Sequence, residues 1–84
     1  MNIMHFVYLV ECRDKTLYCG YTIDLKKRIE AHNKGKGAKY TMKRRPVRLV
    51  YSKEFKDKSS ALKREAEIKK LKRIEKQKLF LNKF

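Results

Sequence analysis

The chain opens with two short apolar runs separated by a polar segment. Residues 6–10 are all aromatic or branched, residues 13–15 are charged, and a second short run covers residues 17–21. Runs of this length on either side of a polar cluster are typical of buried β-strands. The pattern predicts an antiparallel hairpin at the start of the chain.

A helix is predicted directly after the hairpin. Asp24 is a helix N-cap residue, and Leu25 and Ile29 follow it on one helical face. Gly35 is a residue that commonly ends a helix. The first helix is therefore expected from about Leu25 to Lys34.

Arg28 and His32 stand four residues apart in that helix, so their side chains stack along one face. Residue statistics make Tyr8 and Tyr18 ordinary strand aromatics. Together with Arg28 and His32, however, the two phenols could form one site near Gly20. The missing side chain of Gly20 would leave room there for a substrate backbone.

The register of the hairpin decides whether the two phenols share that site. Opposed residues of an antiparallel pair lie on the same face of the sheet. Tyr8 and Tyr18 therefore converge only if the turn sets a register such as Tyr8 opposite Gly20 and Val10 opposite Tyr18. Val7 is expected to be structural.

The second half of the chain predicts one more strand and further helix. Residues 47–55 form the third strand, with Tyr51 in the core, and a helix is expected to start at Ser59 or Ser60. Its pattern continues to residue 81, as one bent helix or as two helices that part near residues 71–73. The expected fold is α/β, with a three-stranded antiparallel sheet flanked by helices in the order strand, strand, helix, strand, helix or helices.

Length and composition narrow the class of protein. The 84 residues suit a single domain, 1–84, and their formal net charge of +15 predicts a nucleic-acid partner. No segment approaches the eighteen apolar residues of a membrane span, and tryptophan anchors are absent. Cys12 and Cys19 are expected to be buried reduced thiols. We therefore expect a cytoplasmic protein that does not bind membranes and is a monomer.

A basic segment joins the first helix to the third strand. Residues 35–46 begin with glycines and end with a proline, which predicts a loop. It is either a solvated connector or a contact for phosphates, with an aromatic ring available for stacking, and we favour the second reading. The candidate nucleic-acid-binding residues are Lys36, Lys39, Tyr40, Lys43, Arg44 and Arg45. Such cations position a backbone without reading sequence.

Two tripeptides carry a resemblance to a known family. Residues 6–8, FVY, and residues 18–20, YCG, followed by Arg28, resemble the paired signature of the GIY-YIG nuclease superfamily, and its small stand-alone members most closely. The match continues through Thr22, Leu25, His32, Asn33, Tyr40, Thr41, Pro46, Val47, residues 49–51, Ala61, Glu65 and Lys69. The first triplet lacks the glycine, and Tyr21 stands where some family nucleases carry a lysine.

The resemblance assigns Glu65 the role of the helix glutamate that binds one divalent metal ion. From sequence alone Glu65 would be half of an exposed ion pair with Lys69. A carboxylate that holds a mostly hydrated Mg²⁺, or Mn²⁺, is chemically sensible. Glu67 lies about 200° around the helix and would not reach the same ion. Family nucleases also use an asparagine near the end of the domain, and Asn82 is the candidate.

The activity that the resemblance implies is metal-dependent hydrolysis of phosphodiester bonds, with DNA favoured over RNA and with little sequence selectivity. The implied catalytic residues are Tyr8, Tyr18, Arg28, His32 and Glu65, and Glu65 is also the implied metal ligand. One tyrosine oxygen would accept the proton of the attacking water, and Arg28 would neutralise charge on the phosphorane. The alternative is a basic nucleic-acid-binding module without catalysis, on the same fold.

Overall fold

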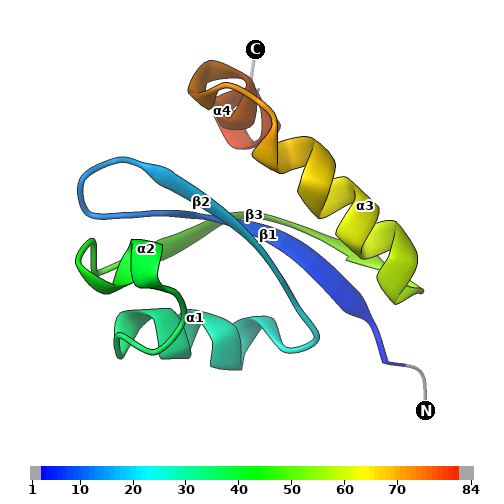
Figure 1. Ribbon diagram of the computed structural model, residues 1–84, viewed down its shortest axis with the longest axis horizontal. Helices are drawn as coiled ribbons and strands as arrows, with labels where there is room; N and C mark the ends of the chain where they lie inside the picture. The colour runs from blue at the N-terminus through cyan, green and yellow to red at the C-terminus, as the bar shows by residue number, and fades with distance from the viewer. Residues whose placement is uncertain (1–2, 82–84) are drawn as a thin grey trace.

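The computed structural model describes residues 3–81 and contains three strands and four helices within that range (Figure 1). Their order is β1 (His5–Glu11), β2 (Leu17–Thr22), α1 (Leu25–Asn33), α2 (Lys39–Met42), β3 (Arg48–Phe55), α3 (Lys58–Lys69) and α4 (Arg73–Leu81). The strands form one antiparallel sheet in the order β2-β1-β3. The predicted fold class is confirmed.

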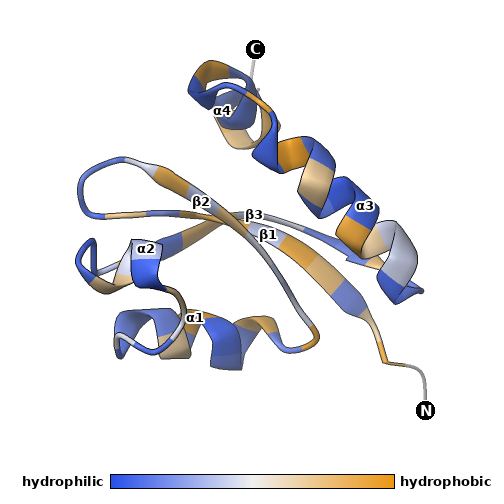
Figure 2. Cartoon of the chain, in the orientation of Figure 1, coloured by the Kyte–Doolittle hydropathy of each residue, from blue (hydrophilic) through white to orange (hydrophobic). Residues whose placement is uncertain are grey.

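The apolar run of β1 reflects its place at the centre of the sheet. Helices α1 and α2 lie on one side of the sheet, and α3 and α4 lie on the other (Figure 1). Residues 7–10 are all buried, because neighbouring strands pair with both edges of β1 and helices cover both faces. Hydropathy colouring shows β1 as an apolar ribbon among largely hydrophilic helices (Figure 2).

The sheet divides the interior into two clusters. Towards α3, the buried residues are Val7, Leu9, Cys19, Ala61 and Ile68, with Tyr51 packed against them. Towards α1, they are Tyr8, Val10, Cys12 and Val47, with Tyr18, Leu25 and Ile29 packed against them. Both cysteines are buried and free, and Val7 and Tyr51 are core residues, as the sequence predicted.

One helix boundary differs from that expected, and one alternative left open by the sequence is decided. Asp57, not Ser59 or Ser60, caps α3: its carboxylate accepts a hydrogen bond from the Ser60 backbone N–H at 2.7 Å. The C-terminal pattern forms two helices. The Glu75 carboxylate accepts a hydrogen bond from the Lys72 backbone N–H at 2.8 Å, which caps the start of α4 and settles the alternative that the sequence left open.

The basic segment 35–46 is not entirely a loop. It contains the short helix α2, which lies next to α1 and buries Thr41. The segment begins at Gly35, which has a φ of +81° at the end of α1, the left-handed conformation that favours glycine. Among the described residues, no helix is long and apolar enough to cross a membrane.

Candidate active site

The hairpin register brings the two signature tyrosines to one face of the sheet. Tyr8 is opposite Gly20 and Val10 is opposite Tyr18, as expected for a shared site. The space above Gly20 is filled, however, because a Cβ at this position would overlap the Tyr8 hydroxyl group. The expectation of free room for a substrate backbone at Gly20 was therefore wrong: the glycine accommodates the protein's own tyrosine.

His32 lies in the last turn of α1 and is fully buried, not exposed as an isolated histidine at a helix end would usually be. Its Nε2 atom lies 2.7 Å from the Tyr8 hydroxyl oxygen. Its Nδ1 atom lies 2.8 Å from the Thr41 hydroxyl oxygen. Thr41 in turn donates a hydrogen bond to the Ala38 carbonyl oxygen at 3.1 Å. Four groups from β1, α1 and the start of α2 thus form one buried chain.

The direction of these hydrogen bonds follows from the far end of the chain. The single proton of the Thr41 hydroxyl goes to the Ala38 carbonyl, so the Thr41 oxygen accepts from the imidazole Nδ1–H. The Nε2 atom of a neutral His32 then carries a lone pair, and the Tyr8 hydroxyl donates to it. We assign this tautomer from the hydrogen-bond partners.

Burial and one cation keep Tyr8 and His32 in their neutral forms. Burial raises the pKa of Tyr8 to about 12, although the nearby Arg28 guanidinium opposes the rise. Burial lowers the pKa of His32, and the Arg28 charge lowers it further. A neutral phenol beside a neutral imidazole is the protonation state that the hydrogen-bond chain requires.

Gly37, in the basic segment 35–46, packs directly against the His32 imidazole ring. A Cβ at this position would overlap the His32 Nδ1 atom. Gly37 and Thr41 were not among the site residues expected from sequence, although both belong to the segment that the resemblance covers. The sequence offered no separate signal for Gly37, because the glycines of this segment already indicated a loop. In the structure its φ is not positive, so the close approach of the His32 ring accounts for the glycine.

Tyr18 lines the same site and is only half-buried. Its ring packs edge-on against His32, with the centroids 5.4 Å apart, and stacks on Tyr40 at 5.8 Å. Tyr40 is 38% exposed. The stacking platform expected for a nucleic-acid base therefore already has a partner within the protein.

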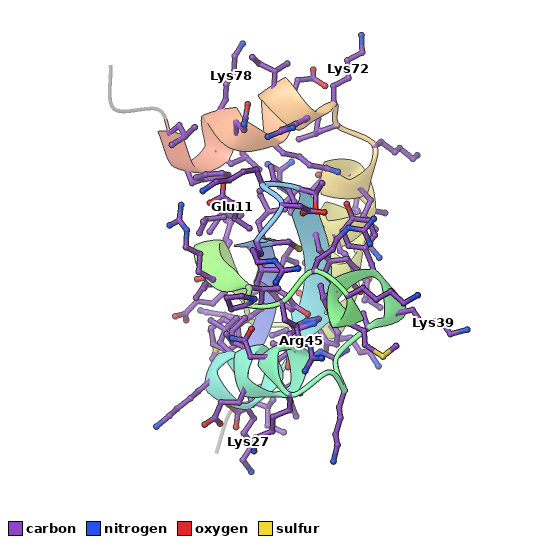
Figure 3. The ribbon with its side chains drawn as sticks, turned by 90° about the vertical axis from the view of Figure 1, so that its left-hand side faces the viewer. Glu11, Lys27, Lys39, Arg45, Lys72 and Lys78 are labelled. Carbon is purple, nitrogen blue, oxygen red and sulfur yellow. The ribbon has the colours of Figure 1, made fainter. Side chains whose placement is uncertain are left out.

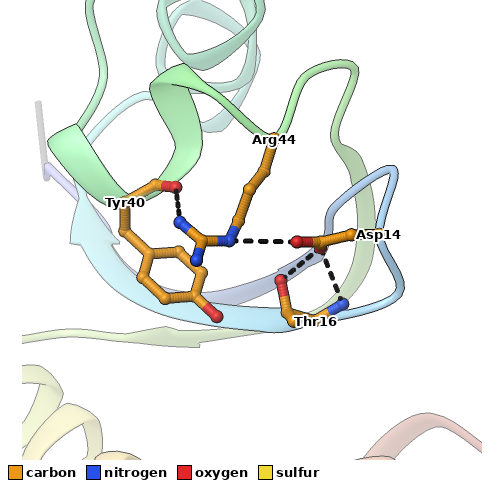
Figure 4. A network of polar contacts seen from close by, with 4 residues as sticks. All are labelled: Asp14, Thr16, Tyr40 and Arg44. Atoms are coloured by element: carbon orange, nitrogen blue, oxygen red, sulfur yellow. Dashed lines mark hydrogen bonds and ion pairs between the residues drawn. The ribbon is translucent and has the colours of Figure 1, made fainter.

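Arg44 is likewise engaged within the fold (Figure 4). Its guanidinium carbon lies 4.1 Å from the centroid of the Tyr40 ring, and Nη1 donates to the Tyr40 carbonyl oxygen at 2.8 Å. Its Nε contacts the Asp14 carboxylate at 3.1 Å. Hydrogen bonds from Thr16 and the charge of Arg44 lower the pKa of Asp14. Arg44 thus connects α2 to the β1–β2 turn, a role within the fold that the sequence analysis did not expect beside its role as a phosphate contact.

The other cations of the basic segment are exposed. Lys36, Lys39 and Lys43 face solvent, and Lys39 stands away from the ribbon in Figure 3. Arg45 donates to the Met42 carbonyl oxygen at 2.8 Å and, with Lys43, lines a surface hollow beside Pro46. These side chains are placed where a polyanion can reach them.

Arg28 connects the buried chain to the surface. It affects the pKa of both Tyr8 and His32, and it also lines an open hollow beside Tyr21. Its Nε atom is buried and has no hydrogen-bond partner within the described residues. His5 shares this hollow, and its Nδ1 atom lies 2.7 Å from the Tyr21 hydroxyl oxygen.

Glu65 lies on the other side of the sheet. It belongs to the sheet-facing stripe of α3 between Ala61 and Ile68, and its carbonyl oxygen lies 3.9 Å from the Cys19 sulfur. Its carboxylate contacts Lys69 at 3.3 Å and is 17% exposed, so the ion pair expected from sequence is present, but half-buried. Burial and the charge of Glu65 raise the pKa of Cys19 to about 11.

The structure therefore brings Tyr8, Tyr18, Arg28 and His32 together on the α1 side of the sheet, while Glu65 lies on the α3 side, against Cys19 of β2. Within residues 3–81 no three His, Cys, Asp or Glu side chains are grouped as a metal site. Asn82 lies outside the described residues.

Comparison with known proteins identifies the family. The GIY-YIG catalytic domain matches residues 4–78. A UPF0213 protein of Staphylococcus saprophyticus is 57% identical over 75 residues, which cover 89% of this chain and 92% of the relative. One from Haloquadratum walsbyi is 53% identical over 79 residues, covering 94% and 89% of the two chains.

Two solved structures agree with the fold. The solution NMR structure of a UPF0213 protein from Bacillus halodurans is 46% identical with a TM-score of 0.61, and covers 95% of this chain and 85% of that one. That of a protein from E. faecalis is 41% identical with a TM-score of 0.63, over 93% and 85%. By its signature tripeptides, its sheet and these matches, the chain belongs to the GIY-YIG family, alongside the UPF0213 proteins.

Proposed function

We propose that this protein is an endonuclease that hydrolyses phosphodiester bonds in nucleic acid, with DNA as the favoured substrate and Mg²⁺ or Mn²⁺ as the cofactor. The observation that carries the proposal is the buried chain from Tyr8 through His32 to Thr41, with Arg28 beside it. Membership of a family whose characteristic domain is catalytic gives it general support.

A protein that only binds nucleic acid has no use for such a chain. Burying a hydroxyl or an imidazole costs free energy, and the hydrogen bonds it makes return about 1 kcal/mol each, so an apolar trio of similar shape would be at least as stable. Phosphate binding needs only cations at the surface, and this chain has a large excess of them. The buried chain therefore favours catalysis over the binding-module alternative.

The hydrogen-bond chain supplies a route for the proton of the attacking water. The Tyr8 oxygen accepts that proton while its own proton passes to the His32 Nε2 atom, so a phenolate need not form in advance. The new P–O bond forms with the water oxygen, the bond to the leaving sugar oxygen breaks, and that oxygen takes up a proton from solvent water. Thr41 keeps the imidazole in the tautomer that can accept, and the incoming phosphate favours the positive charge that develops on His32.

Arg28 controls access to this route. Tyr8 and His32 are 0% exposed, whereas Arg28 lines an open hollow and lies close enough to Tyr8 to lower its pKa. A phosphate that draws the guanidinium outward would open the Tyr8 hydroxyl to water. The same guanidinium, paired with the phosphate, neutralises charge in the transition state. Tyr18, the half-exposed phenol, forms the neighbouring wall.

Glu65 is the residue that would hold the metal ion: it lies against Cys19 of β2, the edge strand whose neighbouring residue Tyr18 lines the site, so a phosphate bound at this edge would meet both faces. A single half-buried carboxylate suits Mg²⁺, which keeps most of its water and takes few protein ligands. The ion, when bound, supplies Lewis-acid stabilisation of phosphate charge. Lys69 balances the Glu65 charge in its absence.

The proposal is tested by incubating the protein with duplex, branched and single-stranded DNA and RNA, in Mg²⁺, Mn²⁺ or EDTA. We expect Arg28→Ala and Glu65→Ala to lower the cleavage rate by about two powers of ten or more, since a preorganised charge at the reacting phosphate is commonly worth about 3 kcal/mol. Binding should remain, because each removes one charge from a chain of net charge +15.

Glu67→Ala is the matched control. Glu67 lies on the same helix, forms an ion pair with Arg64 at 3.2 Å and points away from the Glu65 side. It should cut at the wild-type rate. If the wild-type protein cuts nothing in the panel, or if Glu65→Ala cuts as fast as wild type, the non-catalytic binding module becomes the correct reading.

A further inference from the structure

An open hollow of about 550 Å³ lies at the end of β2, beside the candidate active site. Strands β1 and β2 contribute to its lining, as do the segment before β1 and the β2–α1 turn. Helix α1 and the first residue of α3 complete it. The residues that matter are Ile3, His5, Tyr21, Ile23, Arg28 and Lys58. Its size is within the range of small-molecule sites.

Two of the residues that line the hollow, His5 and Tyr21, have stacked rings. The rings of His5 and Tyr21 lie 5.9 Å apart at an interplanar angle of 14°, and the His5 Nδ1 atom is 2.7 Å from the Tyr21 hydroxyl oxygen. The Lys58 ammonium lies 5.8 Å from the centroid of the Tyr21 ring. With Nδ1 engaged by Tyr21, Nε2 is the ring nitrogen of His5 that remains for a ligand.

Two cations of the hollow, Arg28 and Lys58, form no ion pair within the described residues. The Arg28 Nε atom is also buried without a hydrogen bond to any of them. The Asp57 carboxylate, next to Lys58 in the chain, accepts hydrogen bonds from the Ser60 backbone N–H at 2.7 Å and from its hydroxyl at 2.9 Å. Asp57 keeps its negative charge while it caps α3, but one carboxylate offsets only one of the two cations, so the hollow keeps an excess of positive charge.

Two isoleucines complete the lining. Ile3 is 61% exposed and Ile23 is 54% exposed, and both belong to the hollow. Apolar side chains next to unpaired cations match the two halves of a nucleotide, whose sugar and base present carbon surfaces and whose phosphate carries the charge. A free inorganic anion would need only the cations.

We propose that this hollow binds the nucleotide adjacent to the scissile phosphate, with that nucleotide's own phosphate against Lys58 and His5 and its sugar against the isoleucines. This inference rests on the proposed function, because it assumes that the protein cleaves a phosphodiester bond at the Tyr8–His32 site. Arg28 belongs both to the hollow and to the buried Tyr8–His32 site, so a strand that enters one passes the other. The hollow thus positions the substrate backbone for the reaction.

The test is a scan with oligonucleotides too short to bind in more than one register, each carrying one neutral methylphosphonate linkage at a different position. Affinity is measured in EDTA, so that no cleavage is required. We expect one linkage at which neutralisation weakens binding of the wild-type protein about tenfold. Lys58→Met should lose that sensitivity and lower the slope of log affinity against log salt by about 0.9, the value for one phosphate contact.

Lys63→Met is the control, because Lys63 is an exposed residue of α3 that does not line the hollow. It should keep the sensitivity of the wild type at that linkage. Equal behaviour of the two variants, or the absence of a sensitive linkage, would overturn the proposal. So would inorganic phosphate that displaces the oligonucleotide from wild type and not from Lys58→Met, since the hollow would then be a free-phosphate site.

Cleavage mapping in Mg²⁺ separates this inference from the proposed function. If the protein cuts, the sensitive linkage should neighbour the cut linkage, and a sensitive linkage elsewhere would contradict the assignment. If the protein does not cut but the Lys58-dependent sensitivity persists, the endonuclease proposal fails while the hollow is supported as a nucleotide-binding site.

Discussion

Replacing Thr41 by valine tests the buried hydrogen-bond chain most directly. Valine has nearly the shape of threonine but lacks the hydroxyl that accepts the His32 Nδ1–H at 2.8 Å. Leaving a buried N–H without a partner costs about 1–3 kcal/mol. The imidazole can avoid that cost by moving its proton to Nε2, where it faces the Tyr8 oxygen. In that tautomer His32 can no longer accept a proton from Tyr8.

The size of the effect follows from this cost. If keeping the productive tautomer requires about 1–3 kcal/mol, the cleavage rate should fall by about 5- to 160-fold, since each 1.36 kcal/mol is one power of ten. The free energy of unfolding should fall by about 1 kcal/mol, which lowers Tm by about 4–8 °C in a domain of this size. Nucleic-acid affinity should not change, because no charge is altered.

Three measurements check these expectations: single-turnover cleavage, thermal unfolding, and ¹⁵N NMR of the His32 ring, which reports the tautomer. Thr41→Ser is the matched control, because it keeps the hydroxyl and should resemble wild type in rate and in ring shifts. A Thr41→Val protein that retains the Nδ1–H tautomer and the wild-type rate would refute the reasoning. The NMR result stands even without a cleavable substrate.

The remaining predictions concern packing, pH, thiol reactivity and salt. Gly37→Ala should destabilise the fold by about 1–3 kcal/mol in chemical denaturation, because its methyl group would overlap the His32 ring, whereas the exposed neighbour Lys36→Ala should be neutral. Because the fold lowers the pKa of His32 from 6.5, the unfolded chain binds a proton that the folded chain excludes. The free energy of unfolding should therefore fall below pH 6.5, by up to about 1.4 kcal/mol per pH unit. Urea titrations between pH 7.5 and 5 measure this fall, and His32→Gln should lack it. Cys19, with its pKa raised to about 11, should resist alkylation at pH 8 in the folded protein and react once unfolded, as followed by mass spectrometry. The log of nucleic-acid affinity should fall steeply and linearly with log salt, and a salt-independent affinity would contradict electrostatic binding.

The pattern of residues determined the elements and their order. Short apolar runs, the Asp24 cap and the glycine at position 35 mark β1, β2 and α1 within a residue or two, because these signals act over only a few neighbours in the chain. The hairpin register could be stated from sequence only as a condition: Tyr8 and Tyr18 share a face only in a register such as Tyr8 opposite Gly20, and the structure has this register. The apolar pattern alone did not choose it, because residues 7–10 are buried whichever face of the sheet they point to.

The content of the site was decided only by tertiary contacts. His32 and Thr41 are nine residues apart and Tyr8 and His32 twenty-four, and only packing α1 and α2 on the sheet joins their hydrogen bonds. Gly20 and Gly37 matter because of what approaches them from other elements, which no local pattern encodes. The placement of Glu65 across the sheet, and the meeting of His5, Tyr21 and Lys58 in one hollow, have the same origin. Propensity and periodicity act along the chain, whereas the partners of a buried polar group are set by which surfaces the fold presses together.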